Sequence, residues 1–343
     1  MSIILGIESS CDETAAAITK DGKLLASVIS SQADIHAKYG GVMPEVASRL
    51  HVENIGVVLK ETMEKAGIGY EDIDAIAFTR GPGLIGSLHA GVEAAKALAL
   101  LYKKPLVPVH HLAGHIYANE YVDSFSFPLL AVVVSGGNTE LVLMEKDLDF
   151  KIIGETKDDA VGESFDKVAR IVGLPYPGGL PIDQHAKKGK PVYDFPIQKL
   201  HHIPGTEKYD YSFSYSGLKT AVLNFVEHKR AKGESYDLDD LCVSFEKAAI
   251  DPVVERMLAA AKEYKVKQVV LAGGVSANSY LRSEAAKALE GTGIHLTIPP
   301  LWCTTDNAAM IAKVGEKLFA AGVTCSLDVD VDPNWQIEDY REF

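Results

Sequence analysis

Two histidines four residues apart are the first candidates for chemistry in this chain: His111 and His115, in the stretch 109–115. If a helix begins here, residues four apart lie one turn apart on the same face. Two neutral imidazoles so placed can bind one transition-metal ion, although the spacing also fits two unrelated histidines on a partly buried helix. The apolar run 105–109 indicates a short buried strand, and strand-to-helix junctions commonly carry the sites of α/β domains.

The residues between the two histidines restrict the chemistry. A zinc protease of the usual kind carries glutamate directly after its first histidine, as general base. Here Leu112 follows His111, and neither Ala113 nor Gly114 can accept a proton. The pattern therefore disfavours that class of protease.

A second feature is a pattern that occurs twice. An apolar run, a small polar turn and a second apolar run follow one another over residues 3–18 and again over residues 129–144. Such a repeat suggests an internal duplication and two similar lobes. In the second copy, Gly136 and Gly137 leave backbone N–H groups with little steric cover, which suits phosphate or carboxylate oxygens, although an ordinary hairpin also uses such a turn.

Hydrophobic periodicity and turn residues predict the elements around these features. Helices are expected over residues 44–65, 87–102, 239–264 and 308–320, and around the apolar face that includes Phe165 and Val168. Residues 175–183 are expected to form a stiff loop, and 186–216 irregular structure. Asp306, just before the last helix, is either a helix cap or a ligand, and capping is the commoner role.

Length, cysteine usage and charge narrow the class of protein. A chain of 343 residues suits two domains; we expect an N-terminal lobe of residues 1–110 plus about 300–343, and a C-terminal lobe of residues 111–299. Four scattered cysteines without a CxxC motif suit a reducing cytoplasm, and no apolar run is long enough to cross a bilayer. The net charge is −13 and no basic run is visible, so a nucleic-acid substrate would need a local patch or a partner protein.

Six motifs, taken in order, resemble one family. They are Glu8-Ser9-Ser10-Cys11-Asp12-Glu13-Thr14, His111-Leu112-Ala113-Gly114-His115, Ser135-Gly136-Gly137-Asn138-Thr139, Asp159-Ala160-Val161-Gly162-Glu163-Ser164-Phe165-Asp166-Lys167, Tyr176-Pro177-Gly178-Gly179 and Gly273-Gly274-Val275-Ser276-Ala277-Asn278. The chain resembles, over nearly its whole length, the bacterial TsaD type of tRNA N6-adenosine threonylcarbamoyltransferase, a relative of the Kae proteins once labelled O-sialoglycoprotein endopeptidases. Many members carry histidine where this chain has Asn138; because asparagine also donates and accepts hydrogen bonds, we expect altered detail and not lost function.

The resemblance implies a fold, a metal and a substrate site. The fold would be the α/β fold of actin-like ATPases, sugar kinases and heat-shock chaperones (ASKHA), with two duplicated lobes and a central cleft. One divalent metal ion per subunit, iron with zinc as the alternative, would be held by His111, His115 and Asp306. The substrate site would be lined by Val134, Ser135, Gly136, Gly137, Asn138, Asp166, Gly179, Asp183 and Asn278.

The resemblance also implies a reaction and partners. The threonylcarbamoyl group of threonylcarbamoyl-AMP would move to the N6 amine of adenine 37 in tRNAs that read codons beginning with A, releasing AMP. Partners would be tRNA, a TsaB-type dimerising paralogue and a TsaE-type ATPase, in the cytoplasm and without a membrane. The donor is already activated, so no protein nucleophile is needed and no catalytic residue is assigned; Glu13 or Asp12 could take the amine proton. Alternatives from other classes are an ATP-dependent kinase or ATPase on the same fold, a metalloprotease, and a non-enzymatic scaffold.

Overall fold

The computed structural model describes residues 2–340 and divides the chain into two compact units. The first unit combines the residues up to Tyr121 with those from Pro300 onward, and the second comprises Val122–Pro299. The first crossing was expected near residue 110, and the structure places it eleven residues later. The reason is that the helix after residue 110 packs against a helix from the C-terminal part of the chain and so remains with the first unit.

A five-stranded sheet organises the first unit, with the strand order β3-β2-β1-β4-β5. Its strands are β1 (Ile3–Glu8), β2 (Glu13–Lys20), β3 (Lys23–Ser31), β4 (Ala75–Gly81) and β5 (Leu106–His110). Strands β1, β2 and β3 form an antiparallel meander, whereas β1, β4 and β5 run parallel. The predicted acidic turn is the connection between β1 and β2.

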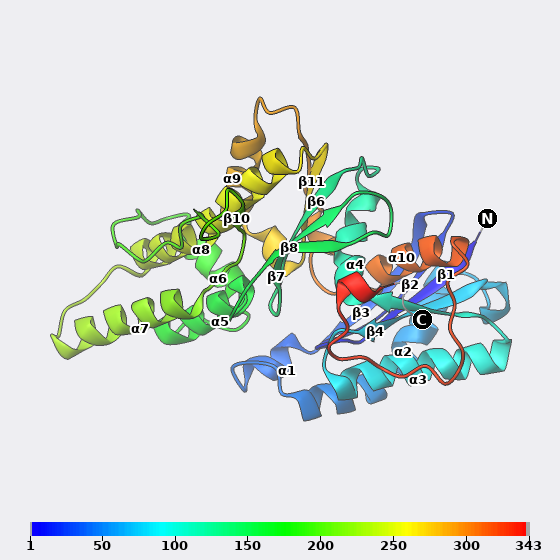
Figure 1. The fold of residues 1–343 in the computed structure, drawn as a ribbon. Coiled ribbons are helices and arrows are strands. Elements are labelled where there is room, and N and C mark those ends of the chain that lie inside the picture. The colour runs from blue at the N-terminus through cyan, green and yellow to red at the C-terminus, as the bar shows by residue number, and fades with distance from the viewer. Residues whose placement is uncertain (1, 341–343) are drawn as a thin grey trace. The chain divides into compact units, whose positions relative to one another are not determined.

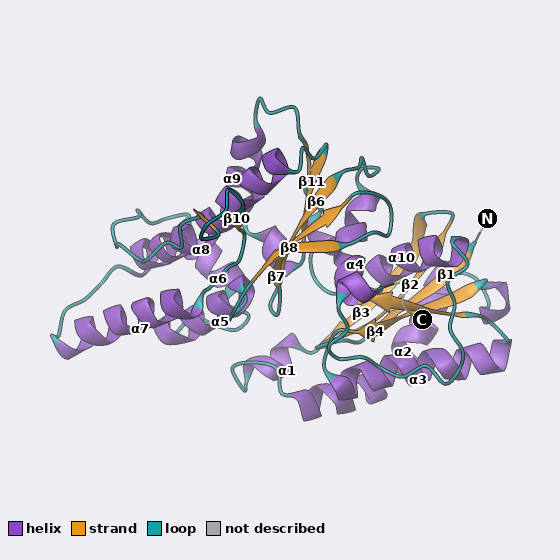
Figure 2. Cartoon of the chain, in the orientation of Figure 1, coloured by secondary structure: helices purple, strands orange, loops and turns teal. Residues whose placement is uncertain are grey.

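Helices cover both faces of this sheet, as Figure 2 shows with helices in purple and strands in orange. The helices of the first unit are α1 (Ala33–Ala37), α2 (Pro44–Ala66), α3 (Ile85–Tyr102), α4 (His111–Tyr117) and α10 (Ala308–Ala320). Helices α2 and α3 pack together on one face, and α10 lies on the other against β1, β2 and β4 (Figure 1). Short 3-10 helices occur at Tyr70–Asp72, Ala118–Tyr121, Leu301–Cys303 and Ile337–Asp339.

The second unit repeats the same sheet. Its strands are β6 (Leu129–Val134), β7 (Thr139–Met144), β8 (Lys151–Glu155), β11 (Gln268–Ala272) and β12 (His295–Thr297). The order is β12-β11-β6-β7-β8, in which β6, β7 and β8 form an antiparallel meander and β6, β11 and β12 run parallel. Strand for strand this is the topology of the first sheet, which agrees with the duplication suggested by the two strand-turn-strand patterns.

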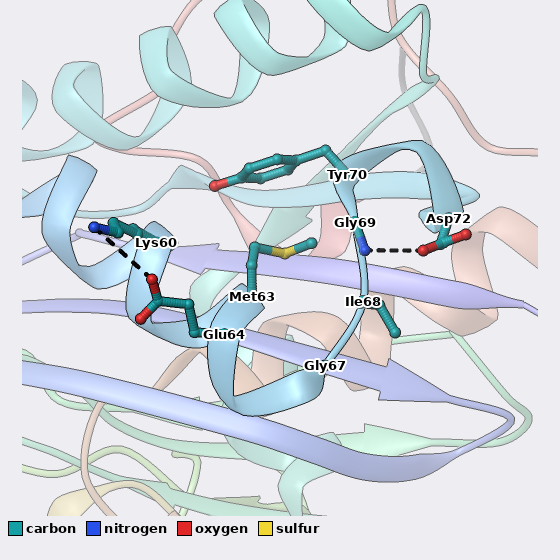
Figure 3. A pocket seen from close by; sticks show the side chains of 8 residues that line it. All are labelled: Lys60, Met63, Glu64, Gly67, Ile68, Gly69, Tyr70 and Asp72. Atoms are coloured by element: carbon teal, nitrogen blue, oxygen red, sulfur yellow. Dashed lines mark hydrogen bonds and ion pairs between the residues drawn. The ribbon is translucent and has the colours of Figure 1, made fainter.

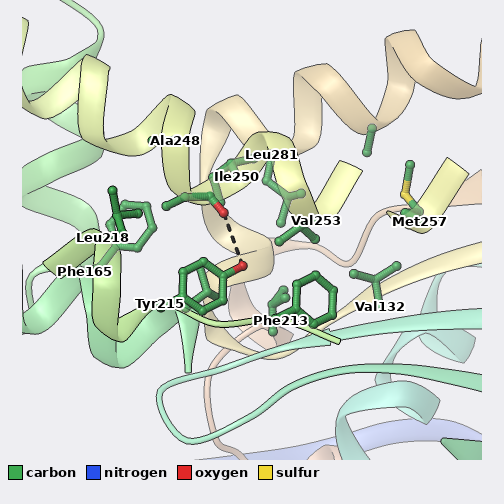
Figure 4. Close-up of a cluster of buried hydrophobic side chains, with 14 of the residues drawn as sticks. Val132, Phe165, Phe213, Tyr215, Leu218, Ala248, Ile250, Val253, Met257 and Leu281 are labelled. Carbon is green, nitrogen blue, oxygen red and sulfur yellow. Dashed lines mark hydrogen bonds between the residues drawn. The ribbon is translucent and has the colours of Figure 1, made fainter. Parts of the chain in front are cut away.

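Helices α5 (Val161–Val172), α6 (Gly179–Ala186), α7 (Ser216–Ala231), α8 (Leu238–Glu263) and α9 (Ser279–Leu289) belong to the second unit, with a 3-10 turn at Gly274–Ala277. Their apolar faces form a continuous core with β6, part of which is drawn in Figure 4. Phe165 from α5 meets Phe245 from α8 edge to face, with ring centroids 5.0 Å apart. The hydroxyl of Tyr215, buried in the same core, donates to the carbonyl of Ala249, which satisfies its polar end.

One expected element is wrong. The stiff loop expected over residues 175–183 ends at Gly178, and Gly179–Ala186 form helix α6. Pro181 misled the prediction, because proline in the first turn of a helix blocks no hydrogen bond. Asp183 therefore points from a helix and not from a loop. The segment between α6 and α7 is mostly irregular, as expected, with two short paired strands, β9 (His201–His202) and β10 (Tyr209–Asp210).

Among residues 2–340, no helix combines the length and the apolar character that crossing a membrane requires.

Candidate functional site

The parallel strands of the first unit bring three distant groups to one edge of the sheet. Glu8 ends β1, Thr79 lies near the end of β4, and His111 follows β5 directly. Because these strands run in the same direction, their carboxyl ends meet, and ligand sites of open α/β sheets lie at such edges.

Helix α4 presents the two histidines. All seven of its residues are buried. Its first turn is capped by His110, whose Nδ1 accepts from the backbone N–H of Leu112 at 3.2 Å. The Nε2 of His110 donates to the carbonyl of Trp335 at 2.8 Å, so the C-terminal segment helps to fix the start of the helix. Burial lowers the pKa of His110 to about 3, which keeps this ring neutral and able to accept.

Asp306 approaches from the C-terminal part of the chain. The capping role that competed with a ligand role belongs to its neighbour Asn307, whose side chain accepts from the N–H of Met310 at 3.0 Å. Helix α10 can lie close to β1 because Gly6 has no side chain: a Cβ at that position would come within 2.5 Å of the carbonyl oxygen of Ala308. The Asp306 carboxylate is thereby left to face the two histidines.

Three ligand atoms converge at this point. The Nε2 atoms of His111 and His115 are 3.2 Å apart, and Oδ1 of Asp306 lies 3.0 Å from the Nε2 of His115 and 3.5 Å from that of His111. Two atoms bound to one zinc or iron ion at about 2.1 Å lie roughly 3.0 to 3.4 Å from each other in octahedral or tetrahedral coordination. Two edges of the triangle fall in this range and the third, at 3.5 Å, lies just above it, so the donor set that the resemblance implied fits a divalent metal ion.

The charges of the site point the same way. Burial alone would lower the pKa of His111, but the carboxylates of Asp306 and Glu8 outweigh burial and raise it to about 9. Burial would raise the pKa of Asp306, yet His111 and His115 hold it at about 2. Without a metal ion, the two carboxylates hold a second proton on His111; a divalent cation bound at the site would take the place of that proton and balance the same negative charge.

Glu8 supports this site and was missed as a site residue by the sequence analysis. Its side chain is fully buried and accepts from Nδ1 of His111 at 3.1 Å, from the hydroxyl of Thr79 at 2.6 Å and from the backbone N–H of Ser10 at 2.5 Å. The available signal was a glutamate directly after the apolar run 3–7, because a charge at the end of a buried strand requires partners.

The acidic turn between β1 and β2 contains the two carboxyls considered as proton acceptors. Burial, together with the negative charges of Asp306 and Asp12, raises the pKa of Glu13 to about 10. In the chain by itself Glu13 is therefore a neutral acid at pH 7, which weakens its case as a general base.

In the second unit, the turn after β6 is the equivalent of the acidic turn. The N–H of Ser135 donates to the carbonyl of Asn138, and the hydroxyl of Ser135 accepts from the N–H of Asn138. A Cβ on Gly136 or Gly137 would meet no atom within 4 Å, so this side of the turn is open. Gly273, at φ +87°, closes the other side, where a Cβ would lie 2.5 Å from the carbonyl oxygen of Val134.

Asp166 and Gly179 lie close together because α6 starts against α5. The carboxylate of Asp166 accepts from the N–H of Gly178 at 2.6 Å, directly before Gly179 opens α6. Asp183, one turn further along α6, is buried, and its Oδ1 accepts from both the N–H and the hydroxyl of Ser279. These two carboxylates thus order the starts of helices α6 and α9.

Asn278 completes this group at the start of α9. Its Oδ1 accepts from the N–H of Leu281 at 2.8 Å, and its Nδ2 donates to Oε1 of Glu246 at 2.6 Å. Burial and the charge of Asp183 raise the pKa of Glu246 to about 7, against the opposing hydrogen bond from Asn278. The sequence analysis missed Glu246, although it falls on the apolar stripe of its helix beside Phe245 and could have been suspected for that reason.

A separate hollow lies elsewhere on the first unit (Figure 3). It has a volume of 460 Å³ and lies between the end of α2 and the start of β4, lined by Lys60, Met63, Glu64, Gly67, Ile68, Gly69, Tyr70 and Asp72. This is the amino end of β4, whereas the histidines follow the carboxyl ends of the parallel strands. The hollow contains none of the predicted site residues.

Solved structures define the class to which this fold belongs. Component A of (R)-2-hydroxyglutaryl-CoA dehydratase from Acidaminococcus fermentans matches 93% of this chain and 100% of its own, with a TM-score of 0.55 and 16% identity. HypF of T. kodakarensis matches 93% of this chain and 48% of its own, with a TM-score of 0.59 and 15% identity. The chain therefore has the α/β fold of these proteins, which agrees with the ASKHA fold that was expected; at such low identity these likenesses concern the fold alone.

Sequence relatives define the family within that class. The family model of tRNA N6-adenosine threonylcarbamoyltransferase (TsaD) matches residues 23–313. Proteins of that name from Geobacillus thermodenitrificans and Bacillus subtilis are each 52% identical to this chain, over 96% and 98% of its length and 95% and 96% of theirs. The chain belongs to the TsaD family of tRNA N6-adenosine threonylcarbamoyltransferases, which confirms the resemblance found in its motifs.

Proposed function

We propose that this protein transfers the threonylcarbamoyl group from threonylcarbamoyl-AMP to the N6 amine of adenine 37 in tRNAs that read codons beginning with A. The products are N6-threonylcarbamoyladenosine and AMP. The observation that carries the proposal is identity of about one residue in two, over nearly the whole chain, to enzymes of that name.

The reaction requires the protein to position its substrates and does not require a protein nucleophile. The donor is a mixed anhydride, so its carbonyl carbon is already activated and AMP is a stabilised leaving group. The protein must hold the acyl phosphate, stabilise the negative charge that develops on it, and align the adenine amine.

The turn Ser135–Asn138 is suited to the anionic part of the donor. Its glycines leave one side of the turn open, and backbone N–H groups in such a turn can bind phosphate or carboxylate oxygens. The side chain of Asn138, which stands where many relatives carry histidine, donates to Oε1 of Glu140 at 2.9 Å. We expect the oriented amide to serve the donor as a neutral hydrogen-bonding group.

The carboxylates of α5 and α6 are suited to the nucleoside part. We propose that the carboxylates of Asp166 and Asp183 accept hydrogen bonds from the ribose hydroxyls. Asn278 would keep the start of α9 in place for the same ligand, and Gly179 would let the nucleoside approach the backbone.

We propose that His111, His115 and Asp306 hold one divalent ion, iron with zinc as the alternative. When bound, such an ion supplies Lewis acidity to donor oxygens. Because α4 is buried along its whole length, the backbone positions of His111 and His115 are set before any ligand arrives. Of the two carboxyls in the acidic turn, Asp12 is the better candidate to accept the amine proton, since burial and the charges of Asp306 and Asp12 raise the pKa of Glu13 to about 10 in the chain by itself.

We propose further that tRNA docks with help from other proteins, namely the TsaB-type and TsaE-type partners of the family. The chain carries a net charge of −13, so it does not offer the general basic surface that nucleic-acid binding alone requires. No disulfide joins its four cysteines within the described structure, which supports a reducing compartment such as the cytoplasm.

The proposal is tested by mixing the purified protein with threonylcarbamoyl-AMP and unmodified tRNA, with and without the two partners, and measuring the modified nucleoside by mass spectrometry. We expect its formation in the complete mixture and not without this chain. ATP hydrolysis or phosphoryl transfer by the protein with no modified nucleoside would support the kinase alternative and overturn the proposal.

A further inference from the structure

We propose that Glu8 is a positioning residue: it fixes the tautomer and the ring orientation of His111 so that this histidine can bind a metal ion through Nε2. The inference rests on the metal site of the proposed function and adds to it a residue outside the three ligands. It can fail while that site stands.

The contacts of Glu8 converge on one ring nitrogen. Oε2 of Glu8 lies 3.1 Å from Nδ1 of His111 and accepts from the hydroxyl of Thr79 at 2.6 Å, while Oε1 accepts from the N–H of Ser10 at 2.5 Å. The carboxylate is thus held at both oxygens by groups that end β4 and follow β1. It cannot turn away from the histidine without breaking these bonds.

A carboxylate only accepts, so this contact requires a proton on Nδ1 of His111. When a metal ion displaces one proton from the ring, the proton on Nδ1 is the one that Glu8 retains, and Nε2 presents a lone pair toward the Nε2 of His115 and Oδ1 of Asp306. The opposite tautomer would place a hydrogen inside the ligand triangle and prevent binding. Carboxylates behind metal-binding histidines commonly act in this way.

Ser10 offers a rival acceptor, because its hydroxyl lies 3.1 Å from the same Nδ1. A hydrogen bond to a carboxylate is the stronger of the two, since one partner is charged. Moreover, the backbone of Ser10 donates to Glu8, so the serine is itself positioned by the glutamate. We therefore assign the orienting role to Glu8 and a secondary role to the hydroxyl.

Two further observations support the assignment. The side chain of Glu8 is 0% exposed, and in the described part of the chain its ion pair is with His111. Burying a carboxylate costs free energy, and the contact with the His111 ring is what offsets that cost here. His115 has no such support: its Nδ1 is buried and finds no hydrogen-bond partner among residues 2–340. His111 is thus the ligand whose orientation the protein fixes.

The test compares metal binding by four full-length, metal-stripped proteins: wild type, Glu8→Gln, Thr79→Val and Ser10→Ala. Binding of Co²⁺ is followed by calorimetry and by the visible spectrum of the ion, which reports the ligand set. The amide of Glu8→Gln keeps the volume but lacks the charge and places a donor beside the ring. We expect Co²⁺ affinity to fall about 10- to 100-fold in Glu8→Gln, with an altered spectrum, and to fall much less in the other two.

Thr79→Val is the matched control, because it removes a bond to the same Glu8 oxygen without touching His111. Circular dichroism and thermal unfolding check that each variant folds, and Glu8→Asp replaces Glu8→Gln if the amide variant does not. Wild-type Co²⁺ affinity and spectrum in the folded Glu8 variant would overturn the assignment. If His111→Ala binds Co²⁺ as tightly as wild type, the ligand set itself is wrong, which is a separate failure.

Discussion

At the scale of single residues, the site depends on where charges are buried. His111 lies between the carboxylates of Glu8 and Asp306. The two carboxylates stabilise the protonated form of His111, and His111 stabilises the ionised form of Asp306. The spacing of the histidines suggested a metal site and the family resemblance added Asp306 to it; the structure brings the three donor atoms within 3.5 Å of one another. The sequence could not show that Glu8 supports the site, because the role of a buried carboxylate depends on the strand pairing that surrounds it.

Glu246 leads to a prediction about stability and pH. Its pKa is about 7 in the folded protein, above the ordinary value of 4.5, so the folded state holds this proton more tightly than the unfolded state. The contribution of Glu246 to stability is therefore complete below pH 4.5 and is lost as the pH rises to about 7. The glutamine of Glu246→Gln does not titrate, so this variant lacks that pH dependence.

We expect the free energy of unfolding of wild type, measured by urea titration relative to that of Glu246→Gln, to fall by on the order of 2–3 kcal/mol between pH 4.5 and pH 7.5. Comparing the two proteins at each pH cancels the other titrating groups. A difference that stays constant across this range would contradict the shifted pKa of Glu246.

At the scale of elements, helix boundaries decide which groups are available for chemistry. The periodic pattern predicted α10 over Ala308–Ala320, as the structure has it. It left the role of Asp306 open between cap and ligand, because the two roles have the same sequence position. The structure resolves this by giving the cap to Asn307, one residue later.

The cap can be tested by Asn307→Ala. Its loss leaves the first turn of α10 without an acceptor and should lower the free energy of unfolding by about 1 kcal/mol. Asp306 would then be free to turn back and cap the helix, so we also expect weaker metal binding, measured by calorimetry. Asn278→Ala is the comparison, since it removes the equivalent cap of α9 in the second unit. Equal metal affinities in wild type and Asn307→Ala would contradict this account of Asp306.

Helix α6 shows where local patterns fail. Its sequence opens with glycines and a proline, which favour a loop, and its helical form is stabilised by contacts made at a distance in sequence. Asp166 holds its start through Gly178, and Ser279 donates to Asp183 within it. Tertiary contacts therefore outweigh local preference in this segment.

At the scale of the whole molecule, one strand order is used twice. The order β3-β2-β1-β4-β5 in the first unit corresponds to β8-β7-β6-β11-β12 in the second. The sequence revealed this through two strand-turn-strand patterns, because apolar runs and small turns survive divergence better than residue identities. It misplaced the first boundary by eleven residues, since nothing local shows that α4 packs with α10.

The two copies also differ in chemistry, which explains why only one is expected to hold a metal ion. The turn after β1 is acidic and lies beside His111, whereas the turn after β6 contains two open glycines. We propose that the first copy provides the metal ligands and the second the anion and nucleoside contacts.

The most direct measurement is threonylcarbamoyl transfer by metal-stripped protein to which iron is returned in steps, with tRNA, donor and partners present. The account predicts that the rate rises with bound iron and levels off at about one ion per chain. In His111→Ala or Asp306→Ala, once circular dichroism has shown that the variant is folded, neither the amount of bound iron nor the transfer rate should rise. A full rate in the stripped protein, or a full iron complement in the double variant His111→Ala/His115→Ala, would contradict it.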